Sequence, residues 1–185
     1  LRFNSADSAY LNRTLSANIT IFSMSFWYKY VASTRNDIFC TNSSYGHYFY
    51  QHTDGSFRLN NNTSNLFTSN GLYRDPSAWY HIIVTNDGSY YKLYVNGVLD
   101  KSHSTGTYLN SGTFYIGHDS SSTYANAYLA DVHFIDGQAL AATDFGEFDD
   151  NNVWQPKKFA GSYTTGPIYS NSTDASLTHS SGPTG

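Results

Sequence analysis

Charge, cysteine and long apolar runs are all scarce in this chain of 185 residues. Only 13% of the residues are charged, Cys40 is the single cysteine and Glu147 the single glutamate. One cysteine excludes an internal disulfide and a cysteine-rich metal cluster. The shortage of glutamate argues against a long coiled coil. No apolar run reaches the roughly 18 residues of a membrane-spanning helix, so we expect no membrane insertion.

Basic residues are also few and scattered. The net charge is −4, and Lys157-Lys158 is the only adjacent pair of basic residues. Proteins that bind DNA or RNA usually cluster Lys and Arg to neutralise phosphates. We therefore expect no nucleic-acid partner.

Aromatic and small polar residues are abundant instead. Aromatic residues make up 17% of the chain, with 17 Tyr among them, and Ser, Thr and Asn together contribute 60 residues. Disordered chains are poor in aromatics and rich in charge, which is the opposite composition. Aromatic residues favour strands, whereas Asn and Ser favour turns. The composition therefore predicts a folded, all-β domain.

The apolar pattern predicts about ten short strands joined by tight turns. In residues 19–31 large apolar side chains alternate at period two, and Trp27 falls on the other, mixed face. Asp54-Gly55, Asp87-Gly88 and Asn96-Gly97 are hairpin signals. Further strands are expected at residues 37–41, 46–53, 56–60, 79–86, 90–95, 98–100, 113–118 and 127–135. Such spacing is typical of a β-sandwich or jelly roll.

Two segments depart from the strand pattern. A short helix is expected near residues 143–148, with Thr143 as its N-cap. Residues 160–185 are rich in Gly, Ser, Thr and Pro and lack a periodic apolar pattern. We therefore expect one β-sandwich domain at residues 1–159, followed by a tail or linker at residues 160–185.

Two motifs resemble a known family. Residues 79–84 (WYHIIV) with residues 94–97 (YVNG) are similar to the W-x-H-I-x-V … Y-V-N-G hairpin of laminin-G-like and pentraxin-like domains. Residues 115–117 (YIG) with residues 128–132 (YLADV) are similar to their I-G … G-x-I-D-D-V signature. These domains belong to the concanavalin A-like lectin/glucanase superfamily. The resemblance implies an antiparallel sandwich of two sheets with the concanavalin A-like jelly-roll topology.

A wider set of segments resembles laminin-G-like modules in virion proteins of marine bacteriophages. The segments are residues 1–11 (LRFNSADSAYL), 74–79 (RDPSAW), 133–140 (HFIDGQAL), 144–147 (DFGE) and 153–158 (VWQPKK). This resemblance implies a virion-surface or extracellular location. Residues 161–169 (GSYTTGPIY) depart from the G-T-Y-G-T-N-G-F-Y-L continuation of such modules, so the role of their tail is not carried over.

The small number and the spacing of the carboxylates argue against glycoside hydrolysis. Glucanases of the superfamily carry a pair of carboxylates on one strand face, spaced E-x-D-x-E, as acid and nucleophile. Here Glu147 lies beside the expected short helix, and Asp131 and Asp136 are five residues apart, across a strand end. No Ser-His-Asp or Cys-His arrangement has a recognisable nucleophile elbow either. We therefore expect no enzymatic activity.

Calcium is the cofactor that the resemblance suggests. Laminin-G-like modules often hold Ca²⁺ at a loop rim, where carboxylates and carbonyls supply oxygens. Asp119 is the best-placed candidate ligand, and Asp131 and the carbonyls of residues 120–123 are its possible helpers. The alternative, which we favour, is that Asp119 caps a turn through its own backbone.

Glycan binding requires an aromatic ring for stacking and polar groups for the sugar hydroxyls. The candidate stacking residues in loops are Tyr45, Tyr73, Tyr108 and Tyr124, and Trp27 is the candidate on the sheet. Asn61, within the run of residues 60–62, is a candidate polar contact. Each has a structural alternative, since Tyr is common at sheet rims and Asn runs form turns. Trp79 is assigned to the core, because it heads the hairpin motif.

Two hypotheses therefore compete. In the first, the chain is a non-catalytic lectin-like module of a phage fibre or capsid decoration, and its partner is a host-surface glycan. In the second, it is a structural subunit whose Tyr-rich surface packs against copies of itself or other virion proteins. Both follow from the resemblance, and fold alone does not separate them.

Overall fold

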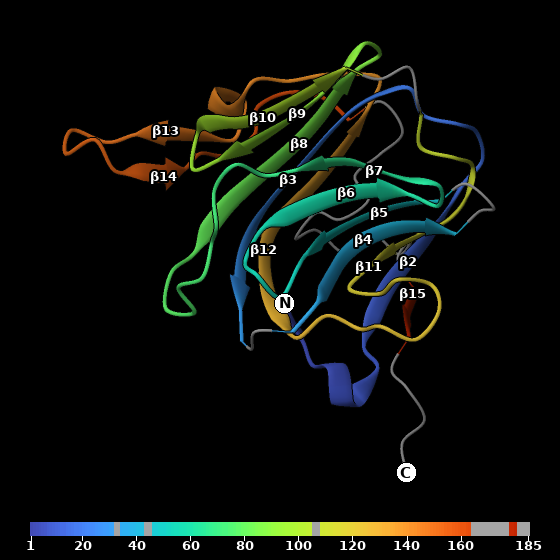
Figure 1. Ribbon diagram of the computed structural model, residues 1–185. Helices are drawn as coiled ribbons and strands as arrows, with labels where there is room; N and C mark the ends of the chain where they lie inside the picture. The colour runs from blue at the N-terminus through green and yellow to red at the C-terminus, as the bar shows by residue number, and fades with distance from the viewer. Residues whose placement is uncertain (32–33, 43–45, 105–107, 164–177, 181–185) are drawn as a thin grey trace.

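The computed structural model of the chain describes residues 1–31, 34–42, 46–104, 108–163 and 178–180 as a two-layer β-sandwich (Figure 1). One layer has six antiparallel strands. In spatial order they are β1 (Arg2–Phe3), β12 (Ala127–Asp136), β3 (Ile21–Tyr30), β8 (Tyr80–Asp87), β9 (Tyr90–Val95) and β10 (Val98–Ser104). The expected all-β sandwich is confirmed.

The second layer has seven antiparallel strands. In spatial order they are β15 (Thr178–Ser180), β2 (Tyr10–Leu15), β11 (Gly112–Ile116), β4 (Asn36–Asn42), β5 (His47–Gln51), β6 (Phe57–Asn61) and β7 (Ser64–Thr68). Because β15 pairs with β2, part of the segment expected as a tail joins this sheet. The domain boundary at residue 159 stays a prediction.

The main core lies between the two sheets. Phe22, Met24 and Phe26, on one face of β3, are fully buried there. The opposite sheet contributes a row of stacked rings, with Phe49 5.3 Å from Phe39 and 5.7 Å from Phe57 between ring centroids. Burying these large side chains removes apolar area from water, which is the main stabilising contribution to the fold.

A second, smaller core lies on the outer face of the six-stranded sheet. Ile83 and Ile135 point outward from the sheet, and Phe145 and Trp154 from the C-terminal part of the chain cover them. We call residues 138–163, which follow β12 and lie over this face, the covering segment. Ser23 holds its start, since the Ser23 hydroxyl donates to the carbonyl of Gln138 and accepts from the Leu140 N–H. On the rest of this face Trp79 and Tyr128 are about two-fifths exposed, and the described residues do not cover them further.

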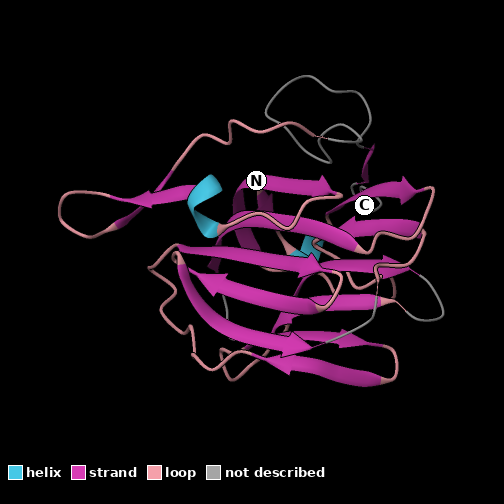
Figure 2. Ribbon diagram, turned by 90° about the horizontal axis from the view of Figure 1, so that it is seen from above, coloured by secondary structure: helices cyan, strands magenta, loops and turns pink. Residues whose placement is uncertain are grey.

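The expected short helix is corrected by the structure. Its place is taken by a single 3-10 turn, Ala142–Asp144, followed by the two-stranded hairpin of β13 (Gly146–Phe148) and β14 (Trp154–Pro156). Residues 146–148 pair with residues 154–156 instead of continuing a helix, and glycine at 146 leaves room for the Trp154 indole, since an added Cβ would be 2.4 Å from the ring. The hairpin projects beyond the sandwich in two perpendicular views (Figures 1 and 2).

Short helices are few in the described part of the chain. The other 3-10 turn is Ser5–Asp7. None of the helices among these residues is long and apolar enough to cross a membrane.

Candidate functional site: a groove on the outer face of the six-stranded sheet

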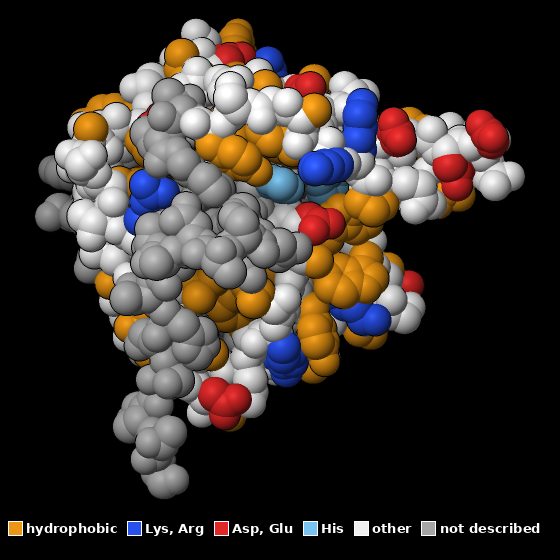
Figure 3. Space-filling view, turned by 180° about the vertical axis from the view of Figure 1, so that it is seen from behind, with side chains coloured by type: hydrophobic (Ala, Val, Ile, Leu, Met, Phe, Trp, Pro, Cys, Tyr) orange, Lys and Arg blue, Asp and Glu red, His pale blue; other side chains and the backbone are white. Residues whose placement is uncertain are grey.

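Three adjoining cavities form a groove on the open part of the outer face, which Figure 3 shows from that side. The His133 cavity has a volume of about 430 Å³. The tryptophan cavity, of about 260 Å³, shares Trp27, Asp131 and Pro156 with it. The Tyr128 cavity, of about 380 Å³, shares Trp79 with the tryptophan cavity. We call the three together the outer-face groove.

All three tryptophans of the chain line the tryptophan cavity. Trp79 is 41% exposed and Trp27 is half-buried, whereas Trp154 is only 8% exposed. Tyr128, 40% exposed, lies edge-on to Trp79 with 6.4 Å between ring centroids. The groove therefore offers partly exposed aromatic faces along its length.

A stack of three rings forms the floor of the groove. The rings of Trp27 and His81 are nearly parallel at 4.9 Å, and His81 in turn lies 6.0 Å from Trp154. The backbone of His81 is held by Asn96, which accepts from its N–H and donates to its carbonyl. Trp154 packs on Gly97, where φ is +79° and an added Cβ would meet the indole at 2.4 Å. The WYHIIV and YVNG motifs thus build the floor.

Hydrogen bonds fix the protonation of His81. The Trp154 Nε1–H donates to His81 Nδ1 at 2.9 Å, and His81 Nε2 lies 2.8 Å from Ser25 Oγ. Burial lowers the pKa of His81 to about 4, so the ring is neutral near pH 7. Since Nδ1 accepts, Nε2 carries the proton and donates to Ser25. His81 therefore cannot remove the Ser25 proton, and the pair is not a nucleophile with its base.

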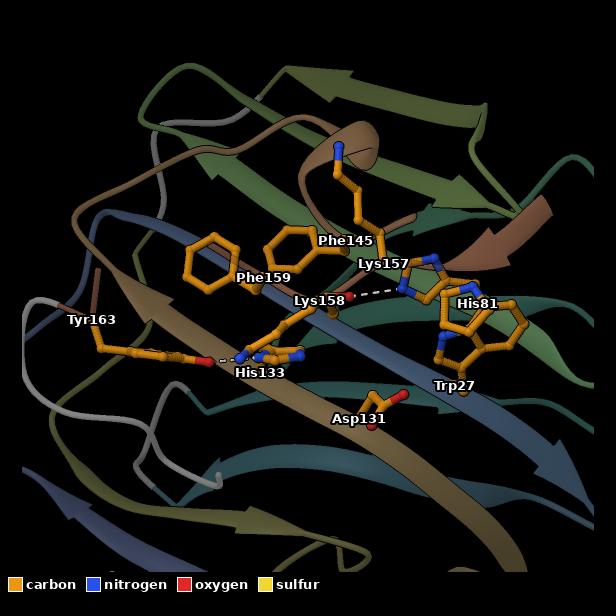
Figure 4. Close-up of a pocket in the computed structure, with 11 residues that line it drawn as sticks. Trp27, His81, Asp131, His133, Phe145, Lys157, Lys158, Phe159 and Tyr163 are labelled. Carbon is orange, nitrogen blue, oxygen red and sulfur yellow. Dashed lines mark hydrogen bonds between the residues drawn. The ribbon is translucent and has the colours of Figure 1, made fainter. Parts of the chain in front are cut away.

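His133 and the C-terminal segment form the far end of the groove (Figure 4). His133 Nδ1 lies 2.7 Å from the Tyr163 hydroxyl, and the His133 ring contacts Phe145 and Phe159. Burial lowers the pKa of His133, and the negative charge of Asp131 partly opposes the shift. Lys158 lines the same cavity with an exposed side chain. This end therefore combines apolar walls with hydrogen-bonding and charged groups.

Carboxylates are almost absent from the groove. Asp131 is the only carboxylate among the residues that line the three cavities. Glu147 lies on the projecting hairpin, 63% exposed in its side chain and 3.9 Å from the Lys157 ammonium. A glycosidase needs two carboxylates flanking the scissile bond. The described groove does not present such a pair.

Of the aromatic residues that the sequence predicts for sugar stacking, the structure brings only Trp27 into the groove among those it describes. Trp27 lies in the groove, as part of its floor. Tyr73 packs against Phe57 and donates to Asp100 at 2.7 Å, and burial raises its pKa. Tyr124 stacks on His118 at 4.4 Å, whereas Tyr108 is 42% exposed and lines none of the three cavities. Tyr45 lies outside the described residues.

Asn61 and Asp119 both serve as turn caps. The Asn61 Oδ1 accepts from the backbone N–H groups of Thr63 and Ser64. Asp119 Oδ1 accepts from the N–H groups of residues 121, 122 and 123, as the favoured alternative predicted. Asp131 lies apart from it, in the groove. Among the described residues no group of three or more His, Cys, Asp or Glu could hold a metal ion.

The assignment of Trp79 to the core is corrected by its exposure. Period two from the buried Ile82 and Val84 puts Trp79 on the opposite face, together with His81. The alternation in the sequence alone is enough to predict this outward position of Trp79. Tyr128 follows the same rule on β12. Trp154, Phe159 and Tyr163 carry no such signal, because their place depends on how the covering segment folds back.

Comparisons with known proteins identify the family. Residues 3–144 match a laminin G family profile described as "Concanavalin A-like lectin/glucanases superfamily". The chain belongs to this superfamily. The recognition of a laminin-G-like, concanavalin A-like module is thereby confirmed, while the closer resemblance to phage virion modules stays a prediction. No curated protein matches the chain.

Solved structures share the fold at low sequence identity. A heptameric SAP-like pentraxin from Limulus polyphemus is 19% identical, with a TM-score of 0.60 and 76% of each chain covered. A candidate carbohydrate binding protein from Bacteroides ovatus is 16% identical, with a TM-score of 0.62 over 76% of this chain and 43% of that one. The sialidase CBM40 of Ruminococcus gnavus, bound to α2,3-sialyllactose, is 12% identical, with a TM-score of 0.51 over 63% and 74%. The chain thus spans less than half of the Bacteroides protein.

Proposed function

We propose that the chain is a non-catalytic carbohydrate-binding module and that its ligand lies along the outer-face groove. The observation that carries the proposal is the set of partly exposed aromatic rings, Trp27, Trp79 and Tyr128, in joined cavities. A pyranose presents flat patches of C–H groups, and these pack well on aromatic faces. The family, together with the glycan-bound CBM40 fold, supports the same conclusion.

Polar groups in the groove suit sugar hydroxyls. Asp131 accepts hydrogen bonds, and Lys158 and Lys29 donate them from the two ends. The tautomer of His81 and the lack of a second lining carboxylate support binding without hydrolysis. The module therefore holds a sugar chain and leaves it intact.

A glycan microarray followed by calorimetry tests the proposal. We expect Trp79→Ala to weaken the binding of the best glycan by about tenfold or more, because stacking and apolar contact are lost together. Tyr108→Ala is the matched control, since Tyr108 is 42% exposed against 41% for Trp79 and lies outside the groove. No binding of any glycan at millimolar concentration, or equal losses for the two variants, contradicts the proposal.

Self-assembly is the second candidate, and the projecting hairpin favours it. Phe148 and Val153 on this hairpin are 48% and 51% exposed, so they add apolar area to a segment that projects from the sandwich. Light scattering of the parent and of a Phe148→Ser, Val153→Ser variant separates the two functions. Oligomers that dissociate in the variant support assembly. The virion-surface or extracellular setting remains a proposal under either function.

A further inference from the structure

A β-bulge interrupts β12 beside the groove. Ala130 pairs with Trp27 and His133 pairs with Ser25, so Asp131 and Val132 together face the single residue Phe26 of β3. Asp131 has a φ of 45°, in the left-handed region. Bulges with a left-handed first residue normally carry glycine there, because a Cβ is disfavoured in that conformation.

Asp131 differs from the other non-glycine residues with positive φ. Among the described residues these are Ser8, Asn96, Ser120 and Asn152, which lie in turns or loops, while Asp131 lies inside a strand. A non-glycine residue held in this region costs free energy, and such residues gather at functional sites. The sequence thus keeps an aspartate where glycine would relieve the backbone.

The bulge delivers an extra side chain to the outer face. Val132 points into the core, 3% exposed, while Asp131 is exposed and lines both the His133 cavity and the tryptophan cavity. Figure 4 shows its carboxylate between His133 and Trp27. None of the hydrogen bonds or ion pairs found among the described residues engages this carboxylate. Its accepting capacity is therefore left for a ligand.

We propose that Asp131 determines the specificity of the groove by accepting hydrogen bonds from two neighbouring hydroxyls of an uncharged pyranose. The inference rests on the proposed glycan-binding function. A carboxylate has two oxygens and accepts two O–H donors side by side, and charged acceptors make the stronger hydrogen bonds. Trp27 and Trp79 line the same cavity and offer faces for the ring of that sugar. A carboxylate placed directly against Asp131 would meet a like charge, so the unit that contacts Asp131 is neutral, although Lys157 and Lys158 line the same His133 cavity.

Asp131→Gly separates the binding role from a structural one. Glycine is compatible with a φ of 45°, so we expect the unfolding midpoint of this variant to equal or exceed that of the parent. We expect its affinity for the best neutral glycan to fall by about tenfold or more, the size of a lost hydrogen bond to a charged group. Asn152→Gly is the control, since Asn152 has a φ of 59° at the tip of the projecting hairpin and no place in the groove. The unfolding midpoint of Asn152→Gly should also equal or exceed that of the parent, while its affinity for the glycan stays unchanged.

A deoxy analogue of the bound sugar allows a double-mutant cycle between Asp131 and the sugar hydroxyl. Removing the hydroxyl that meets Asp131 should weaken binding to the parent, cause no further loss in Asp131→Gly, and cause a smaller loss in Asp131→Asn, whose amide oxygen accepts a weaker hydrogen bond. If both variants bind the sugar as tightly as the parent while Trp79→Ala does not, the inference fails and the proposed function stands. A preference for uronic acids over matched neutral sugars also overturns it. If no glycan binds the parent at all, the proposed function itself fails.

Discussion

The two outer sides of the sandwich use carboxylates in different ways. On the seven-stranded side, Asp37 is fully buried and forms a two-pronged hydrogen bond with Arg35, whose guanidinium lies 4.2 Å from the Tyr50 ring centroid. Asp119 on the same side caps its own loop. On the six-stranded side, Asp131 has no such partner among the described residues. Asp37 and Asp119 therefore stabilise the fold, whereas the Asp131 carboxylate is available to a ligand.

The aromatic residues show the same contrast. Near β2 and β11, His118 stacks on Tyr124 at 4.4 Å, and Tyr10 lies 4.9 Å from His118 and 5.6 Å from Tyr115. These rings cover one another. In the groove, Trp79 meets Tyr128 only edge-on and both stay about two-fifths exposed. An abundance of Tyr therefore does not locate a binding surface. A binding surface is better located by aromatic faces and hydrogen-bond acceptors that have no partner within the fold.

The largest expected effect is a pH response of opposite sign for two buried groups, His81 on the six-stranded side and Asp37 on the seven-stranded side. The pKa of His81 is about 4 in the fold and 6.5 in the unfolded chain, so the unfolded chain binds more protons between these values. Stability from His81 is therefore lost as pH falls from 6.5 to 4. Burial raises the pKa of Asp37 from 3.8 to about 6, so its contribution instead increases as pH falls from 6 to 3.8. Each contribution is about 2–3 kcal/mol by pH 4.5.

Urea unfolding of variants at pH 7 and pH 4.5 measures the two signs. We expect His81→Gln to lose less stability on acidification than the parent, and Asp37→Asn to lose more. His47, buried with a pKa of about 4, is present in both variants and cancels from the comparison. The readout is the change between the two pH values, not the stability at either one. Equal changes in the two variants would contradict the opposite signs expected for His81 and Asp37.

Arg35→Ala should have the next largest effect, confined to the seven-stranded side. It leaves the buried Asp37 carboxylate without its cation, which costs about 3 kcal/mol or more in a fully buried pair. Because the Arg35 side chain is 41% exposed, we expect a loss of about 2–3 kcal/mol in the free energy of unfolding. Lys158→Ala, in the groove, should change it by at most about 0.5 kcal/mol. A similar loss for both variants contradicts the contrast.

Much of the fold could be predicted from local patterns. The alternation in β3 placed Trp27 on the outer face correctly, and β9 has the bounds expected from the sequence. Asn96-Gly97 forms the expected turn, with φ values of 49° and 79°. The sequence pattern does not predict the short or mostly polar strands β1, β2 and β7, because too few apolar residues define a period there. They form because neighbouring strands supply their pairing partners.

The groove could be predicted only in part. The outward positions of Trp27 and Trp79 follow from strand parity, whereas the place of Trp79 at the head of the hairpin motif predicts the core. His133 and Tyr163 are 30 residues apart and meet only because the segment after β14 folds back over the sheet. The left-handed backbone of Asp131 depends on the register of β12 against β3. Such features arise from tertiary pairing, which no local pattern encodes.

The smallest expected effect, a shift in tryptophan fluorescence, tells which side of the sandwich holds a ligand. All three tryptophans line the groove, and none lies in the strands of the seven-stranded sheet. A sugar over Trp79 displaces water from its exposed ring, so we expect a small blue shift on binding. Trp79→Phe should reduce the shift, because Trp79 is the most exposed of the three tryptophans, while Trp27 is half-buried and Trp154 is buried. A ligand stacked on Tyr10 or Tyr124 would leave the emission unchanged, so binding without a shift would move the site to the other side.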